Sequence, residues 1–412
     1  MATGAALPAA PAAVRRRLVI AALGVTQILG WGSTYYLLAV LASPIVADTG
    51  WPLGAVIAGV SLGLLISGLV SIRVGRAIDR FGGRPVLAAS SILFATGLAA
   101  LAAAADVATY LAAWVVIGAG MGAGLYDAAF STLGRLFGRD ARGAITALTL
   151  WGGFASTVCW PLSAVLVESF GWRATCLAYA ALHLAVALPL HLLALPRETE
   201  RPPAAPSRSG GGPTAAPQPS RTAFVLLAAI LTTGGAIAAI ISVHLITVLR
   251  AGGLELAAAI GLGALIGPAQ VGARVVEMLA GRRLHPLWSL AAAASLISVG
   301  LGLLALGTTL PAIALIAYGA GNGVWSIARG ALPLALYGPT GYATLMGRLA
   351  TPSLIAQALA PTLGGILVAD LGAAAMLFAI TLASVANLVA IASLWAMVRR
   401  QATRAVESGS SG

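Results

Sequence analysis

Stretches of about twenty mostly apolar residues recur along this chain, separated by short polar or glycine-containing connections. An α-helix rises about 1.5 Å per residue, so about 20 residues cross the hydrocarbon core of a bilayer. Membrane β-strands instead alternate over roughly ten residues, a pattern that these stretches lack. The pattern therefore predicts an all-α membrane protein with 12 transmembrane helices, at approximately 18–42, 53–73, 86–104, 108–133, 144–168, 174–194, 222–248, 256–280, 287–306, 309–337, 345–369 and 373–397.

A polar segment divides these helices into two sets of six. Residues 196–221 read PRETERPPAAPSRSGGGPTAAPQPSR, and such proline-, glycine- and serine-rich sequences are typical of flexible linkers. We therefore expect a tail over 1–17, a six-helix bundle over 18–195, the linker over 196–221, a second six-helix bundle over 222–397 and a tail over 398–412.

Composition and charge placement agree with a membrane protein. The chain is 59% hydrophobic and 9% charged, far from the balance of a soluble domain. All 24 basic residues are arginine, and outside the predicted helices only Arg173 and Arg250 fall on the side opposite the tails and the linker. Basic residues favour the cytoplasmic side, so both termini and the linker are predicted to be cytoplasmic, in a bacterial inner membrane. The net charge of +12 then reflects topology and predicts no nucleic-acid partner.

The two halves also repeat each other at nearly one offset. GAGMGAG at 118–124 aligns with GAGNGVW at 319–325, and Arg73 aligns with Arg274, both 201 residues apart. Pro161 and Pro361 are 200 residues apart. These pairs predict two duplicated six-helix units related by an axis along the membrane normal.

The connection after the second predicted helix carries a recognisable motif. It reads Gly75-x-x-x-Asp79-Arg80-x-Gly82-Gly83-Arg84, and GWR follows at 171–173. With these features the chain resembles the major facilitator superfamily over about 18–397. The resemblance implies two pseudo-symmetric six-helix bundles and secondary transport by alternating access.

The resemblance also implies a role for this motif. Asp79 would face the positive N-terminal end of helix 11, where an anion is stabilised. Arg80 and Arg84 would pair with acidic groups or anionic head groups, and Gly75, Gly82 and Gly83 would allow close approach of the halves, as a cytoplasmic latch. The alternative is that these arginines only anchor the topology.

Two further segments point to a branch of the superfamily. QVGARVVE at 270–277 and GWGSTYY at 30–36 resemble the monocarboxylate and oxalate–formate porters. Trp114 replaces the helix 4 arginine of the superfamily pattern, and Trp160 precedes Pro161 where drug antiporters carry glycine. We therefore expect transport of an organic anion; the alternative is proton-coupled efflux of drugs or other small toxic solutes.

Ionisable residues within predicted helices are costly, so each is a candidate for function. Arg274 shares a helix face with Gln270 and Glu277 and could bind a carboxylate through its planar fork. Alternatively Arg274 and Glu277 form a structural pair, or Glu277 carries a coupling proton. Asp127 is the other candidate for proton coupling.

Further candidates follow from helical spacing. Arg329 lies in a polar stripe with Asn322 and Trp325, or pairs across the halves with Asp127 as a gate. On helix 1, Gln27, Trp31 and Tyr35 share one face and Tyr36 lies off it. The remaining binding candidates are Tyr126 and Gln357. His183 and His191 fall on helix 6, which the resemblance makes peripheral, and receive no role.

The sequence lacks the signatures of other classes of protein. An intramembrane protease would need a nucleophile and base or a metal pair on facing helices, and a transport-dead sensor usually carries an added soluble domain. The glycine run at 118–124 follows no strand, and a chain without lysine has no Walker motif. We expect a monomeric transporter, not an enzyme, without cofactor or metal, whose partners are a small-molecule solute, a possible coupling proton and the lipid bilayer.

Overall fold

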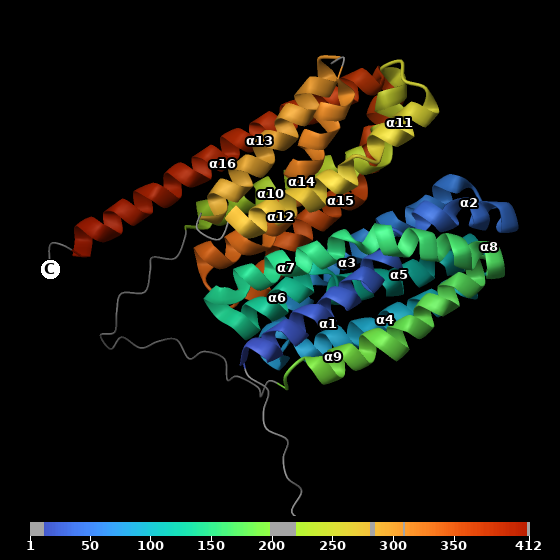
Figure 1. Cartoon of the computed structure of the whole chain (residues 1–412), viewed down its shortest axis with the longest axis horizontal. Coiled ribbons are helices and arrows are strands. Elements are labelled where there is room, and N and C mark those ends of the chain that lie inside the picture. Colours follow the sequence, from blue (N-terminus) through green and yellow to red (C-terminus); the bar gives the residue numbers. More distant parts are fainter. Residues whose placement is uncertain (1–11, 198–219, 281–284, 308–309, 410–412) are drawn as a thin grey trace, which may run out of the picture.

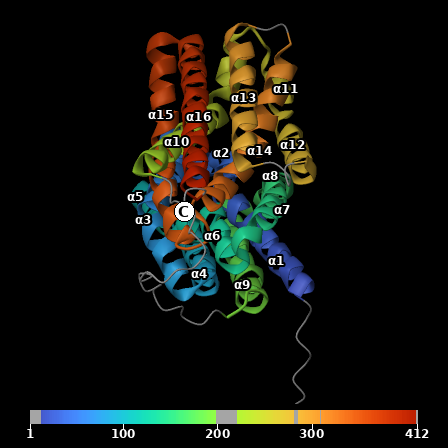
Figure 2. The same cartoon turned by 90° about the vertical axis from the view of Figure 1, so that its left-hand side faces the viewer.

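The computed structural model describes residues 12–197, 220–280, 285–307 and 310–409. Every regular element among these residues is helical. Figure 1 shows two helical bundles, one from each half of the chain, that diverge toward the right of the view. Viewed from the left end in Figure 2, the bundles lie one above the other. The prediction of two six-helix bundles is confirmed, although several of the twelve helices consist of two segments.

The first bundle surrounds its own apolar core. Its elements are α1 (Ala12–Gly32), α2 (Leu38–Thr49), α3 (Leu53–Phe81), α4 (Gly83–Ala102), α5 (Val107–Gly124), α6 (Tyr126–Phe137), the 3-10 helix η1 (Gly138–Asp140), α7 (Ala141–Gly153), α8 (Ala155–Leu182), the π-helix η2 (His183–Ala187) and α9 (Leu188–Ala194). Within α8, Gly171 has a φ of 80°, and there the fifth membrane helix gives way to the sixth.

The second bundle has fewer interruptions. Its elements are α10 (Arg221–Ala251), α11 (Leu256–Gly263), α12 (Ile266–Ala280), α13 (Pro286–Ala305), α14 (Pro311–Tyr337), α15 (Tyr342–Leu371) and α16 (Ala373–Gly409). The helix α16 continues past residue 397, where the sequence predicts the C-terminal tail to begin. Most of the predicted linker, residues 198–219, lies outside the described residues.

Among the described residues, four membrane helices are broken part-way along their length. The breaks separate α1 from α2, α5 from α6, α7 from α8, and α11 from α12. At the second break Leu125 is extended, with φ −81° and ψ −167°. Gly152 and Gly153 precede the third, where small residues leave the backbone free to turn. Broken helices expose backbone groups that can line a ligand site.

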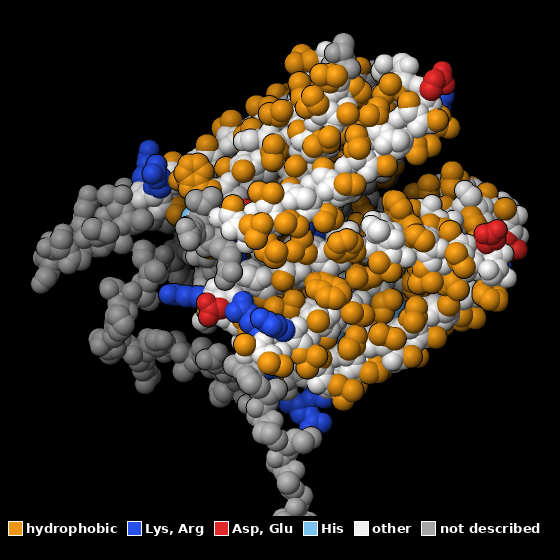
Figure 3. Space-filling view, in the orientation of Figure 1, with side chains coloured by type: hydrophobic (Ala, Val, Ile, Leu, Met, Phe, Trp, Pro, Cys, Tyr) orange, Lys and Arg blue, Asp and Glu red, His pale blue; other side chains and the backbone are white. Residues whose placement is uncertain are grey.

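The outer surface is suited to lipid. Apolar side chains cover the face shown in Figure 3, and large exposed apolar residues occur on several helices, such as Phe170 on α8, Leu193 on α9 and Phe378 on α16. Eight helical segments of the described chain are long and apolar enough to cross a membrane by length and composition; one of them, Val107–Ala194, includes three of the twelve helices. Burial inside each bundle and apolar exposure outside follow from the same hydrocarbon solvent.

The two ends of the molecule differ in charge. Basic side chains gather at the left of Figure 3, at the end where α1 and α10 begin, and a furrow between the bundles opens at the right. We call the first the arginine-rich end; its basic residues include Arg16, Arg80, Arg84, Arg139 and Arg142. The bundles meet at this end and separate toward the other.

Candidate functional site

Close backbone contacts join the bundles near the arginine-rich end. A Cβ atom on Gly75 of α3 would overlap the carbonyl oxygen of Ala343, in the first turn of α15. One turn further along both helices, a Cβ on Gly347 would overlap the carbonyl oxygen of Ser71. Glycine is therefore required on both helices for this approach, as the motif predicts for Gly75.

The motif aspartate lies at the start of α15. The carboxylate Oδ2 of Asp79 accepts hydrogen bonds from the backbone N–H of Thr344 at 2.8 Å and from its hydroxyl at 2.6 Å. Arg135 of α6 donates to the Asp79 carbonyl oxygen. Asp79 thus links the first bundle to an N-terminal helix end of the second, where negative charge is favourable.

The other motif residues shape the turn between α3 and α4. Gly82 has a φ of 85°, which favours glycine, and a Cβ on Gly83 would overlap the side chain of Thr132. Arg80 is exposed and its guanidinium lies 4.9 Å from the centre of the Phe81 ring. Arg84 is half-buried. The motif glycines therefore permit close packing, while the two arginines make no acidic contact within the described residues.

A second link between the bundles is an ion pair between α7 and α12. Arg142 of α7 lies 3.2 Å from Oε1 of Glu277 on α12, and Ser289 donates to the same oxygen at 2.7 Å. Glu277 therefore pairs with the other bundle rather than with Arg274, the structural pair that helical spacing allows. Nearby His285 caps α13, and partial burial together with the charge of Arg142 lowers its pKa, which favours the neutral ring.

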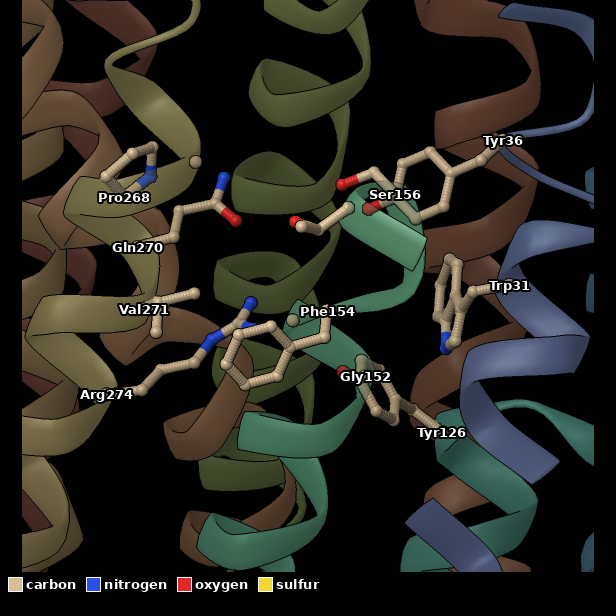
Figure 4. A pocket seen from close by; sticks show the side chains of 13 residues that line it. Trp31, Tyr36, Tyr126, Gly152, Phe154, Ser156, Pro268, Gln270, Val271 and Arg274 are labelled. Carbon is tan, nitrogen blue, oxygen red and sulfur yellow. The ribbon is translucent and has the colours of Figure 1, made fainter. Parts of the chain in front are cut away.

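The main cavity lies where the broken helices converge, between the bundles. Its volume is about 420 Å³, within the usual range for a small-molecule site. Figure 4 shows Gln270 and Arg274 pointing in from α12, with Trp31 and Tyr36 on the opposite wall. The complete lining is Trp31, Tyr36, Tyr126, Gly152, Gly153, Phe154, Ser156, Thr157, Gly267, Pro268, Gln270, Val271 and Arg274.

Arg274 is the charged residue of this lining. It is 6% exposed, its Nη1 donates to the Thr149 carbonyl at 2.9 Å, and its Nε donates to the Gly323 carbonyl at 3.4 Å. Both acceptors are neutral, and no carboxylate of the described chain pairs with Arg274. Within the described part of the chain, a buried positive charge therefore lies beside the cavity without a carboxylate partner.

One wall of the cavity is aromatic. The ring centres of Trp31 and Tyr126 are 5.1 Å apart, and those of Trp31 and Tyr36 are 6.2 Å apart. Gln27 is fully buried behind this wall: it accepts from the Trp31 indole at 3.2 Å and donates to the Gly124 carbonyl at 2.7 Å. Gln27 thus orients Trp31 and is not part of the lining.

Tyr36 lines the cavity, and its assignment to another face was wrong. The prediction assumed one continuous helix, whereas α1 ends at Gly32 and the Tyr36 N–H bonds to the Trp31 carbonyl, five residues back. This wider turn rotates Tyr36 toward the cavity. Tyr35 instead reaches the second bundle, with its hydroxyl 3.4 Å from that of Ser242.

A second, small cavity lies beside a buried ion pair. Arg329 of α14 donates to Asp127 of α6 at 2.5 Å, so the two residues pair across the bundles, one of the two arrangements that the sequence allows. They line a space of about 20 Å³, too small for an organic solute, together with Trp325 and Ser353. This region is therefore a contact between bundles, distinct from the main cavity.

Like Gln27 and Tyr35, the candidates Asn322 and Gln357 lie outside both cavities. Asn322 is half-buried on α14. Gln357 donates to the carbonyl and hydroxyl oxygens of Ser353, both at 3.1 Å, and so supports a residue that lines the small cavity.

Several lining residues escape sequence reasoning. Ser156 and Thr157 follow the break between α7 and α8, and Gly267 and Pro268 lie in the first turn of α12. None is ionisable, so a search for costly polar residues passes over them. The Gly152-Gly153 pair within a predicted helix was the available signal, because paired glycines often mark a break.

The cavity can be narrowed at one position with little other change. A Cβ on Gly152 would overlap the Tyr126 hydroxyl, so Gly152→Ala should displace Tyr126 and weaken ligand binding by about tenfold, since overpacking costs roughly 1–3 kcal/mol. Gly272→Ala on α12 is the matched control, because a Cβ there meets nothing within 4 Å and Gly272 is not part of the lining. Binding measured by calorimetry with whichever solute the protein binds checks this; equal affinity in the two variants would contradict it.

The arrangement resembles known transporters in fold. The crystal structure of the human organic anion transporter MFSD10 (TETRAN) is 16% identical, with a TM-score of 0.73 over 91% of this chain and 99% of that one. FucP in its outward conformation is 15% identical, with a TM-score of 0.71 over 92% of this chain and 99% of that one. The proton:xylose symporter XylE is 12% identical, with a TM-score of 0.69 over 92% of this chain and 95% of that one.

Sequence comparison gives the family. None of the curated proteins matches the chain. The family model of the Major Facilitator Superfamily matches residues 23–347, most of the chain and parts of both bundles. This multi-pass membrane protein therefore belongs to the Major Facilitator Superfamily of transporters.

Proposed function

We propose that this protein is a secondary transporter that moves a small organic anion, such as a monocarboxylate, across the bacterial inner membrane by alternating access. The observation that carries the proposal is the buried Arg274, which lies against the main cavity and, among the described residues, donates hydrogen bonds to two neutral carbonyl oxygens and to no carboxylate. An unneutralised guanidinium in low dielectric attracts an anion strongly, and its planar fork matches a carboxylate.

Charge accounting across the bundle interface supports this assignment. Arg329 is neutralised by Asp127, and Arg142 by Glu277. Arg274 is left as the positive group of the cavity. The N-terminal end of α12, at Gly267, also borders the cavity and adds partial positive charge. Gln270, Ser156 and Thr157 supply polar groups that could orient the solute.

The opposite wall suits an apolar body. Trp31, Tyr36 and Tyr126 present aromatic surface on the side opposite Arg274 (Figure 4), and Phe154 also lines the cavity. A carboxylate with a flat or apolar substituent would satisfy both walls. The fold of the organic anion transporter MFSD10 is compatible with such a solute.

Alternating access requires the contacts at the arginine-rich end to break. We assign this end to the cytoplasm, because basic residues favour that side. The state described is then closed inside and open outside. Inward opening would separate Asp79 from Thr344, Arg142 from Glu277, and Arg274 from the Thr149 carbonyl. Asp127 is the candidate for proton coupling, since protonation would weaken its pair with Arg329.

Efflux of hydrophobic solutes is the second candidate. The aromatic wall favours it, because flat apolar compounds stack on such surfaces. The positive charge of Arg274 disfavours it for cations, which are common among exported drugs. Binding specificity therefore separates the two functions.

A ligand-stabilisation screen on the purified protein tests the proposal. Acetate, lactate, oxalate and benzoate are compared with neutral benzamide and with tetraphenylphosphonium, a hydrophobic cation. We expect at least one carboxylate to stabilise the wild type, by about 2.7 kcal/mol at a concentration of 100 Kd. Arg274→Gln should lose this stabilisation.

The internal repeat supplies the matched control. Arg73 aligns with Arg274 but is exposed on α3, so Arg73→Gln should keep the carboxylate effect. Carboxylate stabilisation that survives Arg274→Gln would refute the anion site. Stabilisation by the cation alone would favour efflux instead.

A further inference from the structure

Two buried imidazoles lie inside the first bundle, away from the cavity. His183 and His191 are 1% and 3% exposed, on η2 and α9 of the sixth membrane helix. Resemblance alone makes this helix peripheral, yet polar groups buried in this way are costly unless they are hydrogen-bonded. Their partners therefore indicate what they do.

Both imidazoles form hydrogen bonds with the first membrane helix, helix 1, which consists of α1, the break over residues 33–37, and α2. His183 Nε2 lies 2.8 Å from the Ser33 hydroxyl, and His191 Nε2 lies 3.1 Å from the Thr26 hydroxyl. Thr26 already donates to the Leu23 carbonyl, so the His191 Nε2–H is the donor in that bond. The hydroxyl of Ser91 on α4 lies 2.9 Å from Nδ1 of His191, so both ring nitrogens of His191 are hydrogen-bonded. Helix 6 is thus joined to helix 1 at two points about two turns apart.

The His183 bond reaches the break in helix 1. Ser33 is the first residue after α1, and the next residue, Thr34, donates through its hydroxyl to the Gly30 carbonyl at 2.6 Å. Side-chain bonds of this kind compete with the helical pattern and favour a break. The backbone resumes as α2 only at Leu38.

The opposite side of the same break forms the cavity wall. Trp31 and Tyr36 lie on either side of Ser33 in sequence and both line the main cavity. The Tyr36 N–H bonds to the Trp31 carbonyl, so their relative placement depends on the conformation of residues 32–35. The hydrogen bond between His183 and the Ser33 hydroxyl therefore restrains the positions of Trp31 and Tyr36 in the cavity wall.

The sixth helix is itself adapted at this point. His183 begins the π-helix His183–Ala187, where one extra residue widens the turn, and its ring centre lies 4.8 Å from that of Phe94. π-Helical turns occur often at functional sites. The wider turn and the contact with Phe94 together hold the His183 ring next to Ser33, at the break between α1 and α2.

We propose that His183, through Ser33, is a positioning residue for the Trp31–Tyr36 wall of the substrate cavity, with His191 and Thr26 as a second anchor. This inference rests on the proposed function only in taking the cavity as the solute site. Neither imidazole contacts the solute. Their bonds hold the break of helix 1 in the conformation that aims the aromatic wall inward.

One test needs no solute. Tyr36→Cys places a thiol in the cavity lining, where a membrane-impermeant maleimide can react with it, whereas native Cys159 and Cys176 are buried. In that background, Ser33→Ala and His183→Phe should each change the labelling rate at least fivefold. The double variant should match the single ones, because both remove the same bond. His183→Gln, whose amide can reach Ser33, should restore the rate.

Tyr110→Phe is the matched control. It removes a buried bond of 2.7 Å, from Tyr110 to the Val56 carbonyl, in the same bundle without touching helix 1. Labelling should then stay at the parent rate. If His183→Phe fails to fold, Ser33→Ala alone decides. Parent-like labelling in Ser33→Ala would overturn the inference.

Uptake of radiolabelled benzoate into proteoliposomes gives the second readout. Ser33→Ala, with Tyr36 intact, should raise KM about tenfold while kcat changes less than twofold, because the cavity wall is displaced and the bundle contacts are kept. Unchanged KM together with unchanged labelling refutes the positioning role. A changed labelling rate in a protein that is stabilised by none of acetate, lactate, oxalate and benzoate refutes the proposed anion function and leaves the positioning role supported.

Discussion

Replacing Arg329 with methionine should lower the free energy of unfolding by about 3–5 kcal/mol and reduce transport by at least 100-fold. The guanidinium pairs with Asp127 at 2.5 Å, and the two side chains are 20% and 17% exposed. Removing one member leaves the other charge buried without a partner, which is the costly outcome for such pairs. Asp127→Leu should destabilise the protein to a similar extent.

The double variant separates stability from function. Asp127→Leu combined with Arg329→Met replaces the pair with apolar side chains of similar volume, so most of the lost stability should return. Under the proposed coupling role of Asp127, transport should remain absent, because an apolar contact between the bundles cannot be switched by protonation. Denaturant unfolding in detergent and proton-driven uptake into vesicles measure the two effects. Additive losses of stability, or uptake in the double variant, would contradict a coupled gate.

The ion pair shows how far sequence reasoning reaches in this chain. Arg329 and Asp127 could be identified because ionisable residues are rare within apolar stretches. Spacing along one helix cannot say which residue on another helix completes a pair, so pairing with Asp127 and contact with a solute stayed alternatives. The same limit applies to Glu277, whose partner Arg142 is 135 residues away.

The helices themselves were predictable and their interruptions were not. Hydropathy reports the average over a whole membrane crossing, and the averages identify twelve crossings. A break of one to five residues hardly alters such an average. The four breaks are decided by local hydrogen bonds and small residues, such as the bond from Thr34 to Gly30 and the Gly152-Gly153 pair. Because the cavity lies at these breaks, its lining was the part least accessible to periodicity.

The same reasoning explains the errors on helix 1. Gln27, Trp31 and Tyr35 share a face only if the helix continues through residue 35. In the structure Gln27 supports Trp31 from behind, Tyr35 reaches Ser242, and Tyr36 takes the cavity position. His183 was passed over for a related reason, since its role depends on a contact 150 residues away in sequence.

Replacing Gly75 with leucine should separate α3 from α15 and open the arginine-rich end. Gly75→Leu places a Cβ where the Ala343 carbonyl lies, and backbone atoms cannot move aside as a flexible side chain can. The two helices must separate, which opens the arginine-rich end. Overpacking of this kind costs roughly 1–3 kcal/mol, enough to shift a two-state equilibrium by about 5–150-fold.

Cysteine labelling detects this opening. Met346, 2% exposed on α15, packs into the core of the first bundle near the arginine-rich end, so Met346→Cys reports separation of the bundles there. Its reaction with a maleimide added from that side should accelerate at least fivefold in Gly75→Leu. Gly302→Leu on α13 is the control, because a Cβ at Gly302 meets nothing within 4 Å, and its labelling should match the parent. If Gly75→Leu also labels at the parent rate, the overlap at Ala343 has been relieved without separating the bundles. The contact between α3 and α15 then does not hold the arginine-rich end closed.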